Sequence, residues 1–134
     1  MDFVAIDFET ATNRRNSACA IGMTEVQNGR IIGTHFTLIK PPGNKYLSHN
    51  TAIHGTTPEM TENAETFTEL WPWIKSVIDG KILVAHFADF DRGVYPTAGG
   101  TGNRKISTGL SEKRICTGKH VNINARLTGK PCVR

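Results

Sequence analysis

The sequence predicts an α/β protein in which a mixed sheet, three antiparallel strands plus one parallel strand, packs against helices. Residues 3–10 alternate apolar and polar side chains at the period of a strand. Asn28-Gly29, a pair typical of tight hairpins, separates two further strand-like stretches. Residues 66–79 repeat apolar side chains at helical spacing, and the wholly apolar run 82–85 then predicts a strand in parallel pairing.

The first strand carries two carboxylates. Residues 3–10 place the larger apolar side chains on one face and Asp7 and Glu9 on the other, roughly 7 Å apart along the strand. Aspartate is depleted in strands, and neighbouring carboxylates repel each other unless a cation lies between them. The pair therefore indicates either a solvated acidic face or a metal site.

An antiparallel meander is expected to continue over residues 18–27 and 30–39, joined by the hairpin. Pro41-Pro42-Gly43 ends the sheet, and we expect a long connection from there to Thr57. Thr57 followed by Pro58 has the pattern of a helix start, with threonine as N-cap and proline at the first position.

The amphipathic helix is expected over residues 66–79, with Gly80 just after its C-terminus. Pro72 falls inside it and must lie in the first turns, unless the helix bends there. After the apolar strand, Asp89 and Asp91 suit the N-terminal turn of another helix.

The regular pattern is lost after residue 95. Pro96 and six glycines interrupt residues 96–134, and only residues 121–125 alternate in a way that could form a strand. We therefore predict a domain over residues 1–95 and a glycine-rich basic tail over 96–134.

The charge distribution changes at the same place. Residues 1–95 hold eight Lys and Arg against eleven Asp and Glu, whereas residues 96–134 hold eight against Glu112 alone. A segment this basic is either a nucleic-acid contact or an unstructured, solvated tail.

The composition narrows the class of protein. No apolar run approaches the ~20 residues of a membrane span, so we expect a soluble, cytoplasmic protein with no membrane partner. Cys19, Cys116 and Cys132 lack a paired spacing, and we expect reduced thiols rather than a disulfide framework or a zinc site.

Asp91 supplies a third carboxylate. Ligand sites in α/β sheets lie at the carboxyl ends of strands. Asp7 and Glu9 lie at the end of the first strand, and Asp91 follows the apolar strand. If these two strands are neighbours, three carboxylates converge, and such an oxygen-rich cluster suits Mg²⁺ or Mn²⁺.

Four segments, taken in order, resemble the DnaQ-like (DEDD) family of 3′–5′ exonucleases, which includes the epsilon-type domain of bacterial DNA polymerase III. Asp7-Phe8-Glu9-Thr10 resembles the first motif, and residues 17–22 (SACAIG) resemble the start of the second strand in many bacterial members. Residues 53–59 (IHGTTPE) are similar to the IHGITPE segment, and residues 84–91 (VAHFADFD) to the second motif, AHNAxFD. The resemblance covers about residues 2–95.

The resemblance implies an RNase H-like fold and two-metal hydrolysis of phosphodiesters at the 3′ end of single-stranded DNA or RNA, with a DNA polymerase as a further candidate partner. Asp7, Glu9 and Asp91 would be the catalytic residues and would hold two Mg²⁺ or Mn²⁺ ions. His54 as an ordinary loop histidine and Phe90 as a core aromatic are the alternatives to a role in the nucleotide pocket. The residues implied to bind the terminal nucleotide are Thr10 (through its backbone), Ile53, His54 and Phe90.

The sequence departs from the family at its third motif, a histidine that acts as general base and an aspartate that completes the metal cluster. No aspartate follows Asp91, and Ala125 stands five residues after His120, the only histidine in that part of the sequence. Phe87 also stands where the family has asparagine. We therefore expect a fold that is incomplete at its C-terminus and little or no hydrolysis.

Two hypotheses account for residues 96–134: an out-of-frame or truncated gene product, or a divergent basic arm that contacts nucleic acid. Three classes of function remain open. The first is an exonuclease-family protein with impaired activity, the second a non-catalytic nucleic-acid- or polymerase-binding module. The third is a misfolded remnant with exposed apolar surface.

Overall fold

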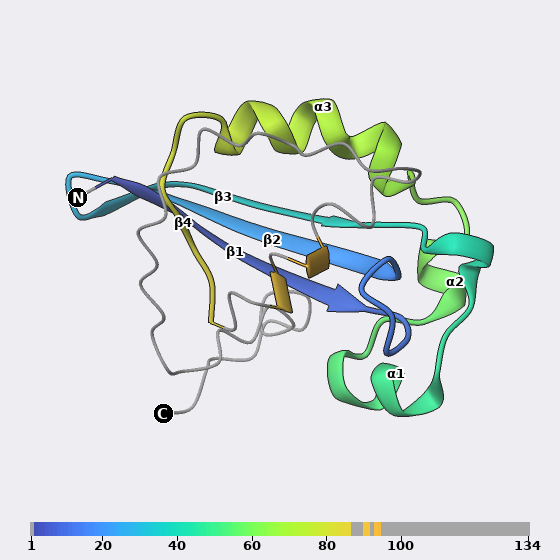
Figure 1. Cartoon of the computed structure of the whole chain (residues 1–134). Helices are drawn as coiled ribbons and strands as arrows, with labels where there is room; N and C mark the ends of the chain where they lie inside the picture. The colour runs from blue at the N-terminus through green and yellow to red at the C-terminus, as the bar shows by residue number, and fades with distance from the viewer. Residues whose placement is uncertain (1, 87–89, 92, 95–134) are drawn as a thin grey trace.

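A four-stranded sheet organises the protein, as seen in a computed structural model that describes residues 2–86, 90–91 and 93–94. Its spatial order is β3-β2-β1-β4. β1 pairs antiparallel with β2, β2 antiparallel with β3, and β1 parallel with β4. The mixed sheet that the sequence predicts is therefore confirmed (Figure 1). The strands are β1 (Phe3–Thr10), β2 (Ala18–Gln27), β3 (Arg30–Leu38) and β4 (Leu83–Val84).

The hairpin between β2 and β3 forms where the sequence predicts it. Asn28 and Gly29 have φ angles of 51° and 75°, the left-handed values that a two-residue hairpin turn requires. β3 ends at Leu38, one residue short of the expected end, and Ile39 is fully buried.

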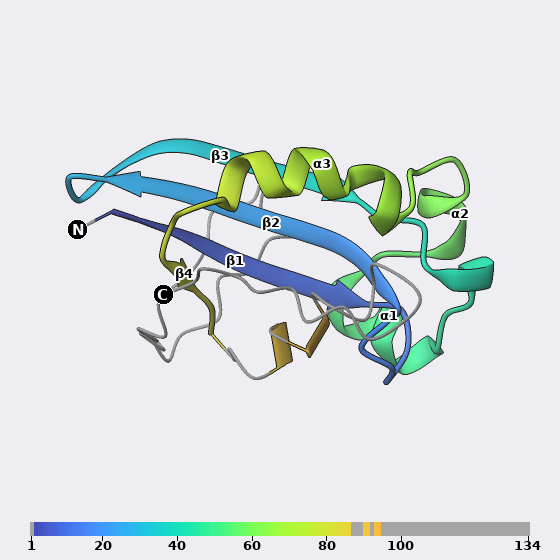
Figure 2. The same ribbon diagram turned by 45° about the horizontal axis from the view of Figure 1, so that its top comes forward.

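Helices lie on both sides of this sheet. α3 (Phe67–Ile78) runs along one face, and the helical stretch of residues 90–91 and 93–94, drawn in orange, lies on the other side in both views (Figures 1 and 2). Phe8 of β1 faces α3, because its ring centroid lies 6.1 Å from that of Phe67. Side chains alternate along a strand, so Asp7 and Glu9 face the opposite side, the side of Asp91. The core residues shared by the sheet and α3 are Val4, Ile6, Phe8, Ile21, Met23, Phe67, Leu70, Ile74, Val77 and Ile78.

α3 begins at a capping box. The Thr66 hydroxyl accepts a hydrogen bond from the Glu69 amide (3.4 Å), and the Glu69 carboxylate accepts one from the Thr66 amide (2.7 Å). Pro72 lies inside the helix on its exposed side, so the carbonyl that loses its partner there is directed away from the core. Gly80 follows the helix with a φ of 69°, as predicted.

We expect Thr66→Ala to lower the free energy of unfolding by about 1 kcal/mol, because it removes the acceptor that caps α3. Urea denaturation of the purified variant measures this loss. Thr68→Ala is the matched control, since Thr68 is exposed inside the same helix and alanine is a better helix former. Equal losses in the two variants would contradict a capping role for Thr66.

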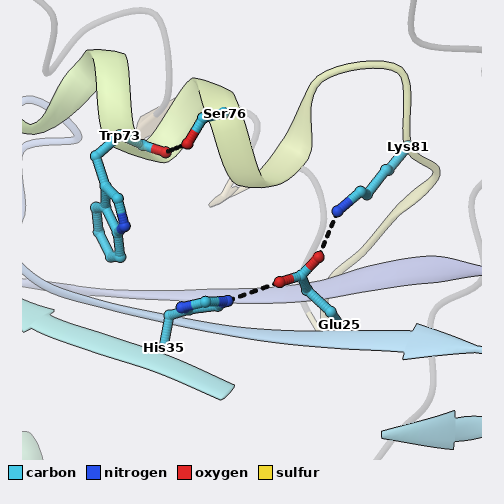
Figure 3. Close-up of polar contacts among 5 residues, drawn as sticks. All are labelled: Glu25, His35, Trp73, Ser76 and Lys81. Carbon is cyan, nitrogen blue, oxygen red and sulfur yellow. Dashed lines mark hydrogen bonds and ion pairs between the residues drawn. The ribbon is translucent and has the colours of Figure 1, made fainter. Parts of the chain in front are cut away.

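A charged cluster ties the connection after α3 to the far end of the sheet (Figure 3). Glu25 of β2 contacts His35 of β3 through Oε1 and Nε2 (2.7 Å), and its other oxygen accepts a hydrogen bond from Lys81. The bond from Lys81, followed by that from His35, lowers the pKa of Glu25. The His35 ring meets Trp73 of α3 edge-on at 6.0 Å, and the Ser76 hydroxyl donates to the Trp73 carbonyl (2.7 Å). The cluster lies away from the carboxylates of β1.

The segment between β3 and α3 is more regular than the sequence analysis anticipated. The long connection expected up to Thr57 contains a 3-10 turn (Pro42–Asn44) and α1 (Ser48–His54), so that expectation was wrong. α1 ends at Gly55, whose φ of 76° lets its amide donate to the Thr51 carbonyl (2.7 Å). The short helix predicted after Thr57 is confirmed as α2 (Pro58–Thr61).

Other expectations have mixed outcomes. The apolar run 82–85 forms only the two-residue strand β4, which is half-buried rather than covered on both faces. Cys19 is a buried free thiol, as expected. Among the described residues no helix has both the length and the apolar character needed to cross a membrane. The predictions that lie outside the described residues concern Asp89, Cys116, Cys132, the strand at 121–125 and the tail at 96–134.

Candidate active site

The carboxylate of Asp91 is fixed to the edge of β1. The Val4 amide donates to the Ile82 carbonyl (2.8 Å), so alternate amides of β1 face β4. Because β4 ends at Val84, the Phe8 amide lies beyond its reach and donates instead to Asp91 Oδ1 (3.2 Å). This buried bond joins residues 83 positions apart and brings Asp91 beside the flanking residues Asp7 and Glu9.

The three acidic side chains influence one another's protonation. Burial, followed by the charges of Asp7 and then Asp91, raises the pKa of Glu9 to about 7. Burial, together with the charge of Asp7, raises the pKa of Asp91 to about 6, against the opposing effect of the Phe8 amide. Asp7 and Asp91 are therefore close enough to Glu9 for their charges to act on it. The convergence of all three carboxylates at one metal site stays a prediction.

The cluster suits a hard divalent cation in its chemistry. Carboxylate oxygens are the preferred ligands of Mg²⁺ and Mn²⁺, and a cation would remove the repulsion that raises the pKa of Glu9. Within the described part of the chain, no three His, Cys, Asp or Glu side chains are arranged to hold one ion by themselves. Magnesium is commonly held by one or two carboxylates, with water and substrate phosphate completing its shell. The residues fit an ion of that kind rather than a closed protein cage.

Two side chains of α1 hold the end of β1 in place. Asn50 Nδ2 donates to the Thr10 carbonyl (3.0 Å), and His54 Nε2 contacts the same oxygen (3.1 Å). Asn50 and His54 lie four residues apart and share one face of the helix. The Leu47 amide adds a bond to the Ala11 carbonyl (2.9 Å). α1 therefore fixes the backbone directly after Glu9, where the pairing of β1 with β2 also shifts register.

The protonation state of His54 follows from its contacts. Its Nδ1 accepts a hydrogen bond from the Thr56 amide (3.0 Å), so Nε2 carries the proton and donates it to Thr10. Burial lowers the pKa of His54 and keeps the ring neutral, although the bond to Thr10 acts in the opposite direction. The Cys19 thiol lies 3.9 Å from Nε2, and burial raises its pKa to about 12. Both ring nitrogens of His54 thus form hydrogen bonds to the backbone.

Asn50 Oδ1 is a buried acceptor without a hydrogen-bond partner among the described residues. Leaving a buried polar atom unpaired destabilises a fold. The role of Asn50 is therefore the hydrogen bond that its Nδ2 donates to the Thr10 carbonyl.

The residues implied to bind the terminal nucleotide lie in different surroundings. Ile53 is 75% exposed at the end of α1, whereas His54 is buried with its ring directed at Thr10. Thr10 is buried, and its carbonyl is already occupied by α1. Phe90 is half-buried and packs against the core. The side chains that remain accessible to a ligand in this set are those of Ile53 and Phe90.

Sequence reasoning missed Asn50 because residues 44–57 were interpreted as a connection. The i, i+4 spacing of Asn50 and His54 before Gly55 was the available signal for a helix with a polar face. Phe87, His120 and Ala125, on which the departures from the family depend, lie outside the described residues.

The chain is similar in sequence to an exonuclease family and to DNA polymerase III proteins. The family model of the RNase T exonucleases matches residues 4–98. A DNA polymerase III of the PolC type from Thermotoga petrophila is 35% identical over 91 residues, which are 66% of this chain and 7% of that protein. An epsilon-like DNA polymerase III subunit from Rhodobacter capsulatus is 30% identical over 95 residues, 68% of this chain and 14% of that protein. The chain thus spans only a small part of these relatives.

Solved structures show the same fold. Exonuclease X, solved in complex with 5′ overhanging duplex DNA, has a TM-score of 0.64 at 24% identity, covering 93% of this chain and 63% of that one. An exonuclease I from Methylocaldum szegediense has a TM-score of 0.61 at 18% identity, covering 69% of this chain and 22% of that one. The family model spans most of the described residues, including all three carboxylates. The chain therefore belongs to the RNase T exonuclease family.

Proposed function

We propose that this protein binds the 3′ end of single-stranded nucleic acid and slowly hydrolyses its terminal phosphodiester with the help of Mg²⁺ or Mn²⁺. The observation that carries the proposal is the hydrogen bond that holds Asp91 at the Phe8 amide, beside Asp7 and Glu9. Burial first, and then the charges of Asp7 and Asp91, raise the pKa of Glu9 to about 7. Buried like charges of this kind are costly to a fold and are typical of functional sites. The similarity to Exonuclease X, whose structure contains DNA, supports a nucleic-acid substrate.

All three carboxylates would hold metal ions in this proposal. Asp7 and Glu9 hold the ions on the face of β1, and Asp91 does so with its geometry set by the Phe8 amide. A bound divalent ion supplies water activation and neutralises charge on the phosphate. α1 keeps the end of β1 rigid, so that Glu9 and the Thr10 backbone keep a fixed position relative to the terminal nucleotide. Ile53 and Phe90 offer apolar surface to its sugar and base.

The rate is expected to be low because Ala125, five residues after His120, stands where the family has the aspartate that completes the cluster. Incubation of the full chain with a 5′-labelled oligonucleotide and Mn²⁺ should release mononucleotides slowly from the 3′ end. Asp7→Ala should lower this rate by roughly a hundredfold or more, as expected for loss of a metal ligand. Asp79→Ala, at an exposed carboxylate after α3, is the matched control and should keep the rate.

A second candidate is a binding module that does not cleave, either alone or beside a DNA polymerase. The missing late aspartate favours it, and the PolC-type relatives suggest the polymerase context. Salt-dependent binding of the oligonucleotide with no mononucleotide release, in either Mg²⁺ or Mn²⁺, would select this candidate over the first. Release that Asp7→Ala leaves unchanged would show a contaminating nuclease and contradict hydrolysis at this site.

A further inference from the structure

The side chain of Arg15 lies directly against Gly93. A Cβ atom at Gly93 would come within 2.1 Å of Arg15 Nη1 and 2.5 Å of its Cδ, far closer than real contacts allow. Gly93 lies in the helical stretch after Asp91 and does not have a positive φ, so the backbone there does not itself require glycine. The absence of a side chain at 93 is what leaves room for the guanidinium group.

The loop that carries Arg15 has a defined shape. The buried Ser17 hydroxyl donates to the Arg14 carbonyl (2.6 Å) and accepts a hydrogen bond from the Thr12 amide (3.1 Å). The Ala11 amide donates to the Ser17 carbonyl (2.8 Å), which closes the loop at its base. Arg14 and Arg15 are exposed on this framework. The loop follows β1 and presents its cations at the carboxyl end of that strand.

Arg15 follows β1 at its carboxyl end, as the acidic cluster does, and lies on the side of the helical stretch that residue 93 faces. Gly93 is two residues from Asp91 in the helical stretch, a Cα separation of about 5.5 Å. Among the described residues Arg15 forms no ion pair. It also does not figure among the causes that shift the pKa of Glu9 or Asp91. Within the described part of the chain, the guanidinium group has no anionic partner that would compete with an anion from outside the protein.

We propose that Arg15 binds a phosphate of the nucleic-acid strand next to the one positioned for hydrolysis, and that Gly93 keeps its guanidinium group beside the site. This inference rests on the proposed function. A planar guanidinium group suits two oxygens of one phosphate, and a cation at the rim offsets the repulsion between the carboxylate face and the strand. Arg15 is thus a substrate-binding residue, and Gly93 is a positioning residue that acts through it.

Oligonucleotide binding by the full chain tests the role of Arg15. The probe is a 5′-labelled oligodeoxythymidine of about 12 nucleotides, followed by fluorescence anisotropy with Ca²⁺ between about 50 and 200 mM salt. Arg15→Gln should weaken binding roughly threefold to tenfold and reduce the salt slope by about 0.7, the value for one phosphate contact on a single strand. Arg30→Gln removes the same charge at the hairpin, at the other end of the sheet, and should change neither quantity.

Gly93→Ala tests the placement of Arg15 without changing any charge. The new methyl group displaces the guanidinium group, so binding should weaken as in Arg15→Gln. In the Arg15→Gln background the alanine should have no further effect. Alanine favours a helix, so the melting temperature of Gly93→Ala should not fall, and lost binding cannot then be ascribed to unfolding.

The outcomes separate this inference from the proposed function. If wild-type protein binds the oligonucleotide but Arg15→Gln behaves like Arg30→Gln, the role of Arg15 is overturned while the site stands. If Gly93→Ala binds like wild type, or its effect adds fully to that of Arg15→Gln, the coupling between the two residues is overturned. If wild-type protein does not bind at all, the proposed function falls, and this inference falls with it.

Discussion

Glu9→Gln is expected to raise the melting temperature of the metal-free protein at pH 8. The ionised Glu9 side chain is partly buried beside Asp7 and Asp91, and its pKa is raised from 4.5 to about 7. A shift of one unit corresponds to about 1.4 kcal/mol, but the carboxylate is partly solvated, so we expect a gain of about 1–2 kcal/mol. For a domain of this size the gain corresponds to roughly 5–10 °C.

The pH dependence of this effect has a definite sign. Below the ordinary pKa of 4.5 the Glu9 side chain is protonated in both the folded and the unfolded chain, and it does not lower the free energy of unfolding. As the pH rises from 4.5 to about 7, the unfolded chain loses the proton first, so the free energy of unfolding decreases. Above pH 7 the free energy of unfolding stays lowered by the full amount. Asp91, whose pKa is raised to about 6, acts in the same direction over a lower range.

Thermal melts at pH 5, 6, 7 and 8 in EDTA check this prediction, with exposed Glu65→Gln as the matched control. The advantage of Glu9→Gln over wild type should grow with pH, whereas Glu65→Gln should follow wild type throughout. Millimolar Mg²⁺ or Mn²⁺ should raise the wild-type melting temperature at pH 8 more than at pH 5, since only ionised carboxylates bind the ion. A Glu9→Gln variant less stable than wild type at pH 8 in EDTA would contradict carboxylate repulsion.

His54→Ala should lower the free energy of unfolding by about 2–4 kcal/mol. The ring is buried, only 3% exposed, and its removal leaves a cavity. It also leaves the buried Thr56 amide unpaired and takes one of two donors from the Thr10 carbonyl. Because that carbonyl follows Glu9 directly, the variant should also bind Mn²⁺ more weakly than wild type.

Urea denaturation and Mn²⁺ titration measure the two effects. His49→Ala is the matched control, since His49 is exposed on the same helix, α1, and its loss should stay within about 0.5 kcal/mol. Burial lowers the pKa of His54, so its contribution is present above the ordinary pKa of 6.5 and decreases as the pH falls below it. A loss in His54→Ala no larger than in His49→Ala would contradict the anchoring role.

Local pattern was enough to predict most of the elements. The alternation in β1 and the Asn28-Gly29 turn each depend on neighbours within a few residues, and each was found where expected. The Thr66 cap of α3 is equally local, but the sequence analysis did not predict it. Glycine also marks the missed helix, because Gly55 ends α1 through a local hydrogen bond. Only the short length of α1 hid it, since a seven-residue helix shows little periodicity.

The sequence by itself determined the family and the order of the strands and α3, because these depend on residue type and spacing along the chain. On the same basis it predicted Asp7, Glu9 and Asp91 as an acidic cluster. Tertiary structure decided how those residues are held. The bond from the Phe8 amide to Asp91 exists because β4 stops short beside β1, which no local pattern records. It also decided that His54 faces the Thr10 carbonyl and that Arg15 rests on Gly93. Such contacts join segments far apart in sequence, and only the packing of the folded chain brings them together.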